Sequence, residues 1–393
     1  MAPRADHKTF DEASQATFQE VLQERLRLAI QYTLITVLEE EVEVFCNAAP
    51  YQRTPQRRDH RNGTYERDLG TTQGVIEKLT VPRTRNGFQS QLFERYQRRM
   101  AELDEAICSM FVRGVSTAGV GTVIEALSGI IPSPSTVSRV FHSLEAEFES
   151  WKIRKLEAHY LYGYADGTYF TVIYDADGCK MPILAIVGID EAGKREVLAF
   201  SVGERENQVA WEDLLEDLKS RGVERVDLWV TDGNKAMLNA ITNQFPTSRR
   251  QRCIKHKMEN VLAYVPEKHH ELVRPELRAI FYQDSREKAD QEVAAFIAKY
   301  ETVYPSAIEC LRRDLDACLT FYSFPKQHWK YIRTTNIIER LFGEVKRRSH
   351  KMAAAFRNQN SCLLMFYAVT RSLKLRRITL PAQETETQLL HNS

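Results

Sequence analysis

Long apolar runs are missing from this chain of 393 residues. The longest apolar run, Leu363 to Val369, is far shorter than the roughly 20 residues that a membrane-spanning helix needs. The first residues, Met1 to Phe10, carry charges and no apolar segment of signal-peptide length. We therefore expect a cytosolic protein that is neither exported nor embedded in a membrane.

Paired cysteines and net charge are also scarce. The seven cysteines are scattered and contain no Cys-x-x-Cys pair, which is typical of reduced thiols. The 54 Lys and Arg residues nearly balance the 53 Asp and Glu residues, so the net charge alone identifies no partner. A hydrophobic content of 43% nevertheless excludes a chain that is disordered throughout.

The charges that are present are segregated along the chain. Residues 52–100 contain 11 Lys or Arg residues against 5 acidic ones, and residues 340–377 contain 10 against the single acid Glu344. Basic surfaces attract polyanions, and nucleic acid is the natural partner for such a distribution.

The pattern of the first 150 residues predicts a mainly helical region. Apolar residues recur at helical spacing from Thr17 to Phe45, which predicts one long helix or two short ones. The segment Gly74 to Val81 is β-prone, and residues 101–148 predict two helices separated by a turn at 131–134. The second of these helices would open at Ser135 with polar side chains, so the pair fits either a helix-turn-helix or an ordinary helical hairpin.

After Trp151 the apolar pattern changes to that of an α/β layer with a mixed sheet. Strands are expected at 160–174, 181–189, 196–202, 226–231 and 250–254, with helices at 207–221 and 235–245. Residues 258–327 have a helical pattern with no strand, and further helices are expected at 336–348 and 360–374. A polar tail follows Leu380.

Three acidic residues occupy positions where an acid is locally unexpected. Asp166 lies in the middle of the first strand, where a buried unpaired carboxylate costs several kcal/mol. Asp232 ends an apolar strand just before Gly233, at the sheet edge where α/β proteins bind ligands. Glu339 lies in the first turn of the helix that opens the basic C-terminal region.

A divalent cation would compensate for the first two acids, because Mg²⁺ prefers carboxylate oxygens. Two such ions can clamp the attacking and leaving oxygens of a phosphoryl displacement. Simpler roles remain open, since Asp232 fits a turn or a helix N-cap and Glu339 fits a capping arrangement with Asn336.

The segment Cys253-Ile254-Lys255-His256 places one Cys and one His at a spacing that permits zinc. No second pair at zinc-finger spacing follows, so a structural role between the last short strand and the helical region is favoured.

Several motifs occur in a fixed order and together resemble the mutator family of bacterial insertion-sequence transposases over nearly the whole chain. They are Tyr96-Gln97-Arg98-Arg99, Ser135-Thr136-Val137-Ser138-Arg139, Asp166-Gly167-Thr168, Val230-Thr231-Asp232-Gly233, Gln251-Arg252-Cys253-Ile254-Lys255-His256-Lys257, Thr334-Thr335-Asn336-Ile337-Ile338-Glu339-Arg340 and Val345-Lys346-Arg347-Arg348.

The resemblance implies an RNase H-like catalytic domain that carries the DDE triad Asp166, Asp232 and Glu339, with an all-helical insertion between the second and third acids. It also implies two Mg²⁺ or Mn²⁺ ions on the triad, cleavage that frees a 3′-OH at the element end, and attack of that 3′-OH on target DNA. The pair Cys253 and His256 belongs to the family pattern, where it marks the entry to the insertion.

We therefore expect a DNA-binding region at 1–150, a catalytic core at 151–257 and 328–378, a helical insertion at 258–327 and a tail at 379–393. The expected function is a transposase that binds terminal inverted repeats as a homodimer or larger assembly and then cleaves and transfers DNA strands. A nuclease or resolvase on the same fold, and a DNA-binding protein without catalysis, are the alternatives. The residues expected to bind DNA are Arg98, Arg99, Ser135, Thr136, Ser138, Arg139, Lys346, Arg347 and Arg348.

Overall fold

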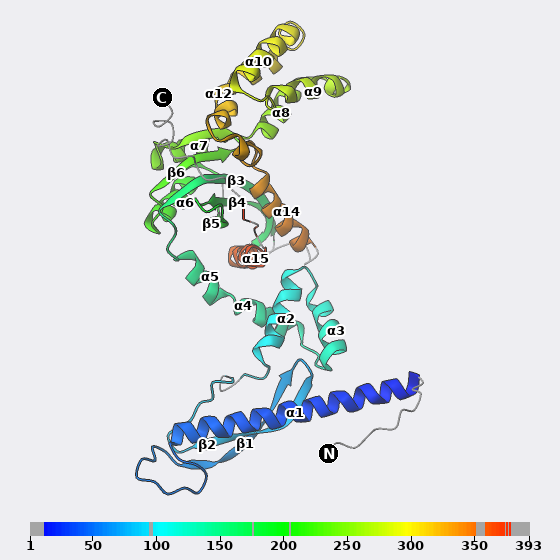
Figure 1. The fold of residues 1–393 in the computed structure, drawn as a ribbon. Coiled ribbons are helices and arrows are strands. Elements are labelled where there is room, and N and C mark those ends of the chain that lie inside the picture. The colour runs from blue at the N-terminus through cyan, green and yellow to red at the C-terminus, as the bar shows by residue number, and fades with distance from the viewer. Residues whose placement is uncertain are drawn as a thin grey trace, which may run out of the picture. The chain divides into compact units, whose positions relative to one another are not determined.

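The computed structural model describes residues 12–93, 97–174, 177–203, 206–350 and 358–378, apart from Lys374 and Arg376. The chain divides into two compact units at the junction of Ser143 and Leu144 (Figure 1). The expected tail at 379–393 lies outside the described residues. Among the described helices, none is long and apolar enough to cross a membrane.

The first unit opens with a single long helix, α1 (Glu12–Cys46), which packs on the antiparallel hairpin of β1 (Arg61–Thr71) and β2 (Gly74–Thr84). Leu34 and Leu38 lie one turn apart on the same helix face, and they share a buried core with Leu69 and Leu79 of the hairpin. The sequence predicted either one long helix or two short ones, and the structure has one long helix.

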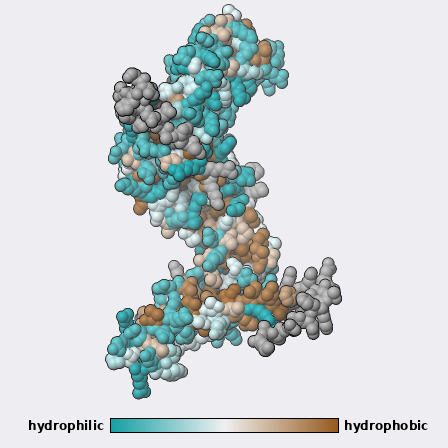
Figure 2. Space-filling model, in the orientation of Figure 1, coloured by the Kyte–Doolittle hydropathy of each residue, from teal (hydrophilic) through white to brown (hydrophobic). Residues whose placement is uncertain are grey.

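The N-terminal half of α1 carries apolar side chains that stay exposed. Phe18 is 56% exposed, Leu22 44%, Leu26 41% and Leu28 54%. Figure 2 shows a band of apolar surface along this helix. Contiguous exposed apolar surface of this kind marks a site of interaction with another molecule.

Three short helices complete the first unit: α2 (Ala101–Val112), α3 (Thr117–Ser128) and α4 (Pro134–His142). They share a buried core that includes Ile107, Val120 and Val137. We expected one helix before the turn at 131–134, and that expectation was wrong, because Gly114 adopts a positive φ of 92° and Ser116 caps a new helix there.

The second unit is built on a five-stranded mixed sheet, as the sequence predicts. The strand order is β5-β4-β3-β6-β7, in which the first three strands form an antiparallel meander and β6 and β7 continue in parallel with β3. The strands are β3 (His159–Tyr174), β4 (Asp177–Ile189), β5 (Arg195–Val202), β6 (Arg225–Thr231) and β7 (Arg249–Arg252).

Helices pack on this sheet and share its core. The connections to β6 and β7 are α6 (Gln208–Ser220) and α7 (Lys235–Gln244), and the fully buried Trp211 and Trp229 lie in the core that these elements share. The helices α5 (Glu145–Lys152), α14 (Asn336–His350) and α15 (Gln359–Ser372) also belong to this unit. The rings of Phe200 on β5 and Phe366 on α15 have centroids 4.6 Å apart, which packs α15 on the sheet.

Between β7 and α14 the chain forms only helices and 3₁₀ turns (Figure 1). These helices have a buried core of their own that includes Val261, Leu277, Phe296 and Leu311. The short strand expected at 250–254 ends at Arg252 instead, because the next helix begins at Ile254. The helices are α8 (Ile254–Leu262), α9 (His270–Ile280), α10 (Arg286–Tyr300), α11 (Pro305–Arg312), α12 (Leu315–Leu319) and α13 (Trp329–Ile332).

Candidate active site

Asp166 and Asp232 lie just beyond the paired part of two neighbouring parallel strands, Asp166 within β3 and Asp232 directly after β6. The strands β3 and β6 are in register at Tyr164 and Val230, and each acid lies two positions beyond its paired residue. Because side chains alternate along a strand, Asp166 shares the face of β3 that Tyr164 occupies, whereas Asp232 follows the end of β6. The charge of Asp232 acts on Asp166 and raises its pKa, which places the two carboxylates in one electrostatic environment.

Asp166 is a buried carboxylate with little compensation. Its side chain is 7% exposed, and it accepts a hydrogen bond of 2.8 Å from the backbone N–H of Gly167. Burial, followed by the charge of Asp232, raises its pKa from 3.8 to about 7. The charge of Glu339 raises that pKa as well, so both of the other expected acids act on Asp166. Burying the Asp166 carboxylate in a strand costs folding free energy, which indicates that a ligand of opposite charge binds there.

Asp232 is half-buried just after β6. Its Oδ1 accepts a hydrogen bond of 2.9 Å from the backbone N–H of Asn234. The N-cap of α7 is Asn234, whose Oδ1 accepts from the N–H groups of Ala236 and Met237. The N-cap role that the sequence left open for Asp232 therefore belongs to Asn234. Asp232 is a turn residue, and among the described residues only its Oδ1 accepts a hydrogen bond.

Glu339 lies in the first turn of α14 and is held by two donors. Its Oε2 is 2.6 Å from the ammonium of Lys255, and its Oε1 accepts a hydrogen bond of 2.9 Å from Thr335 Oγ1. Burial alone would raise the pKa of Glu339, but these two hydrogen bonds lower it below its usual value. The carboxylate is thus charged and oriented by Lys255 and Thr335, in place of the expected arrangement with Asn336.

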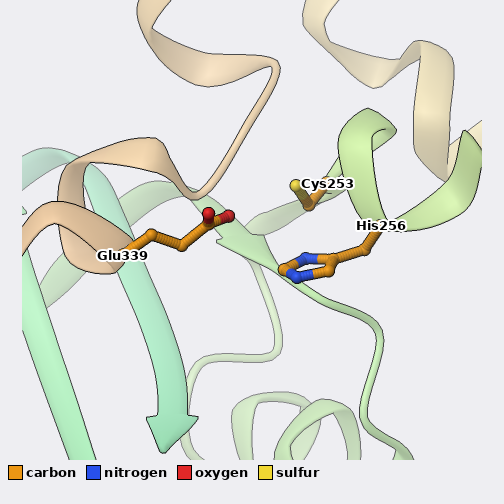
Figure 3. A group of neighbouring side chains, drawn as sticks. All are labelled: Cys253, His256 and Glu339. Atoms are coloured by element: carbon orange, nitrogen blue, oxygen red, sulfur yellow. The ribbon is translucent and has the colours of Figure 1, made fainter. Parts of the chain in front are cut away.

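The family-pattern pair Cys253 and His256 lies beside Glu339 (Figure 3). One ligand atom from each of the three residues lies within 4.8 Å of the other two. The thiol of Cys253 raises the pKa of His256 to about 9, and Thr335 donates to Cys253 Sγ at 3.3 Å. The Cys253 and His256 pair therefore helps to position Glu339, because the Thr335 hydroxyl contacts both Cys253 Sγ and Glu339 Oε1.

The helix α4 presents most of its expected DNA-binding residues to solvent. Ser135, Ser138 and Arg139 are exposed and Thr136 is half-buried, while Val137 packs into the three-helix core. The hydroxyl of Ser133 caps the helix by accepting from the N–H of Thr136. The helix therefore has polar side chains on one face and apolar ones on the other.

A cavity of about 600 Å³ in the first unit brings expected residues together from distant segments. Arg98, Arg99 and Thr136 line it, with Arg67 of β1 beside them. Arg99 is 2.5 Å from Asp104, whereas Nη1 of Arg67 is buried without a hydrogen-bond partner among the described residues. Arg67 was not singled out in the sequence, where it is one of many basic residues in a basic segment.

The three basic residues at the end of α14 differ in their surroundings. Lys346 Nζ donates to Thr168 Oγ1 on β3, two residues from Asp166. Arg347 is exposed and pairs with Glu344 at 2.6 Å. The side chain of Arg348 is only 12% exposed and donates to Ser372 on α15 at 2.7 Å, so it holds two helices together inside the unit.

Known proteins match this chain over most of its length. A family described as transposase, Mutator family, matches residues 2–376. The chain belongs to the Mutator family of transposases. The transposase for insertion sequence element ISRM5 from Rhizobium meliloti (strain 1021) is 34% identical over 366 residues, which are 92% of each chain. The transposase for element IS256 in transposon Tn4001 from Staphylococcus aureus is 32% identical over 341 residues, 86% of this chain and 87% of the relative.

Family membership confirms the resemblance seen in the motifs and makes this chain an insertion-sequence transposase, an enzyme of DNA transposition. DNA is therefore its partner. The transposase for element IS905 from Lactococcus lactis subsp. lactis (strain IL1403), 31% identical over 332 residues, extends the same match to 84% of each chain.

A fourth acid of this Mutator-family transposase lies at the same sheet edge and was missed in the sequence. Glu206 precedes α6, and its Oε1 accepts a hydrogen bond of 2.9 Å from Asn234 Nδ2. Burial and then the charge of Asp232 raise the pKa of Glu206. No local pattern distinguishes Glu206 in the sequence, because a Glu just before an amphipathic helix is an ordinary solvent-exposed residue.

Gly233 of the transposase allows an arginine to lie directly over the turn that carries Asp232. Its φ is +89°, and a Cβ at this position would be 1.5 Å from Nη1 of Arg252. Arg252 is fixed in turn by Asp314, whose Oδ2 lies 3.0 Å from Nη1. The glycine is therefore required both for its backbone conformation and for the close approach of the guanidinium.

Proposed function

We propose that this transposase cleaves and joins DNA at one centre, in which Asp166, Asp232 and Glu339 hold two Mg²⁺ or Mn²⁺ ions on an RNase H-like core. The observation that supports the proposal is the register of β3 and β6, in which both acids follow two residues after Tyr164 and Val230, the last residue pair of these adjacent parallel strands. The antiparallel meander that continues into two parallel strands supports the RNase H-like assignment.

The donor set fits a hard divalent cation. The charges of Asp232 and Glu339 both act on Asp166, the most buried of the three carboxylates, which has a backbone N–H as its hydrogen-bond donor. At Glu339 a cation is already in place, namely the ammonium of Lys255. Carboxylate oxygens are the ligands that Mg²⁺ prefers, and a bound cation offsets the repulsion between carboxylates that act on one another.

Each residue has a separate task in this proposal. When bound, the ions would activate the attacking oxygen and offset the charge on the scissile phosphate. Asp166 and Asp232 fix their position from the rigid sheet, and Glu339 approaches from α14. Lys346, two turns beyond Glu339 on the same helix, places an ammonium beside β3 where it can hold the DNA backbone.

The first unit is proposed to bind the element ends. The exposed face of α4 would supply contacts to base edges, and the arginines around the cavity would hold phosphate. Transposition joins two element ends, so we propose at least a homodimer on DNA, with the exposed apolar half of α1 as the surface that meets the second copy.

A strand-transfer assay tests the proposal. Purified protein is incubated with labelled element-end DNA and a target plasmid in Mg²⁺, Mn²⁺ or EDTA, beside Asp166→Asn, Asp232→Asn and Glu339→Gln. Asp190→Asn is the matched control, because this half-buried acid serves a hairpin turn by accepting from the N–H of Lys194.

The expected result is joined product that requires metal, is lost in the three triad variants and survives in the control, with end binding retained throughout. A triad variant that cuts at the wild-type rate would mean that the acid is misassigned. Metal-dependent cutting without joining would favour the nuclease alternative, and binding without either reaction would leave a DNA-binding protein.

A further inference from the structure

We propose that Glu206 is a fourth carboxylate of the metal centre, supplied from the segment just before α6. The proposal rests on the proposed function, since it presumes that Asp166 and Asp232 hold divalent ions. It adds a ligand from an element that contributes none of the three expected acids.

Asn234 connects the carboxylates of Glu206 and Asp232. Its side-chain Nδ2 donates to Glu206 Oε1 at 2.9 Å, and its backbone N–H donates to Asp232 Oδ1 at 2.9 Å. Asn234 is itself fixed, because its Oδ1 caps α7. A single rigid residue therefore sets the position of Glu206 relative to the second acid of the triad.

Glu206 also lies against β3, the strand that carries the first acid. A Cβ on Gly167 would lie 3.1 Å from Oε1 and 3.2 Å from Oε2 of Glu206, so the carboxylate lies against the backbone of the residue that follows Asp166. A side chain at position 167 would force this carboxylate away, because such contacts are tighter than most that a Cβ makes. The glycine in Asp166-Gly167-Thr168 thus leaves room for a carboxylate against the backbone of the strand that carries the first acid.

Charge balance explains why a fourth carboxylate would lie at the metal centre. Two divalent cations carry four positive charges, whereas the triad alone offers three negative ones. The described partner of Glu206 Oε1 is a neutral amide, so its contact with Asn234 orients the carboxylate without offsetting its charge. A fourth carboxylate would bring the negative charges to four and would add an oxygen ligand to those that water and substrate phosphate supply to Mg²⁺ or Mn²⁺.

The competing explanation is structural, in which Glu206 serves only to hold Asn234. Two substitutions separate the roles. Glu206→Gln keeps the size and the oxygen that accepts from Asn234 but removes the charge. Asn234→Ser keeps an N-cap oxygen for α7 but removes the amide that donates to Glu206. The matched control is Glu212→Gln on α6, because Glu212 accepts from Gln208 and Asn243.

The experiment is a Mn²⁺ titration of the full-length protein, in which free Mn²⁺ is followed by electron paramagnetic resonance. We expect Glu206→Gln to lose at least tenfold in affinity for one of the two ions, while Asn234→Ser loses less and Glu212→Gln binds as wild type does. Wild-type Mn²⁺ affinity in Glu206→Gln would overturn the proposal. So would a metal-free melting temperature of Glu206→Gln several degrees below wild type, since loss of a repelling charge should not weaken the fold.

Asp166→Asn, titrated in parallel, separates this proposal from the proposed function. If Asp166→Asn loses Mn²⁺ binding and Glu206→Gln does not, the result supports the triad and refutes Glu206 as a fourth ligand. If Asp166→Asn also binds both ions as wild type does, the proposed metal centre itself is misplaced.

Discussion

Replacing Asp166 with Asn should abolish DNA cleavage and yet stabilise the metal-free protein at neutral pH. Asp166 is 7% exposed, and burial and the charge of Asp232 raise its pKa from 3.8 to about 7. The folded protein therefore holds this proton more tightly than the unfolded chain does. The stability that this tighter proton binding gives the folded protein is fully present below pH 3.8 and is lost as the pH rises through about 7.

The magnitude follows from the two pKa values. Their difference corresponds to about 4 kcal/mol of lost folding free energy at pH 8 and to about 2 kcal/mol at pH 5. Asn carries no charge and can accept the same hydrogen bond from the N–H of Gly167. The variant should therefore gain stability at pH 8 and gain clearly less at pH 5.

The assay is thermal unfolding of wild type and Asp166→Asn in EDTA at pH 5 and pH 8, repeated at pH 8 with saturating Mn²⁺. In EDTA the variant should melt several degrees higher at pH 8. With Mn²⁺ the order should reverse, because ligand that binds only the folded wild type stabilises it. A variant no more stable than wild type in EDTA at pH 8, or a gain that is equal at both pH values, would refute the reasoning.

Three further predictions concern the turn at the site, DNA affinity and assembly. Gly233→Ala should cost about 1–3 kcal/mol in urea unfolding, because its φ is +89° and the new Cβ meets Arg252; Gly343→Ala, which meets nothing within 4 Å, should cost none. Affinity for element ends should fall steeply from low to physiological salt in filter binding, and a flat response would contradict extensive phosphate contact. Leu22→Glu should shift the DNA complex to a smaller mass in light scattering if α1 joins two copies; an unchanged mass would exclude that surface.

The order of strands and helices in the catalytic unit could be read from the sequence, because each strand has a local apolar period and each turn has local Gly, Asp or Pro signals. Asp166 could be singled out for the same reason, since a carboxylate in an aromatic strand contradicts its surroundings. Where the local signal was weak the prediction failed, as at Gly114, whose positive φ divides a helix that the apolar period alone would continue.

The sequence by itself thus determined the type and order of the elements, the two basic segments and the acids that are anomalous in their own strands. Only the tertiary structure decided which residues meet. The register of β3 and β6 aligns Asp166 with Asp232, and the packing of α14 brings Glu339 to Lys255 across 84 residues of chain. Glu206 could be identified only from the tertiary structure, because the residues that it contacts are distant in sequence. A local sequence pattern does not show contacts between distant residues.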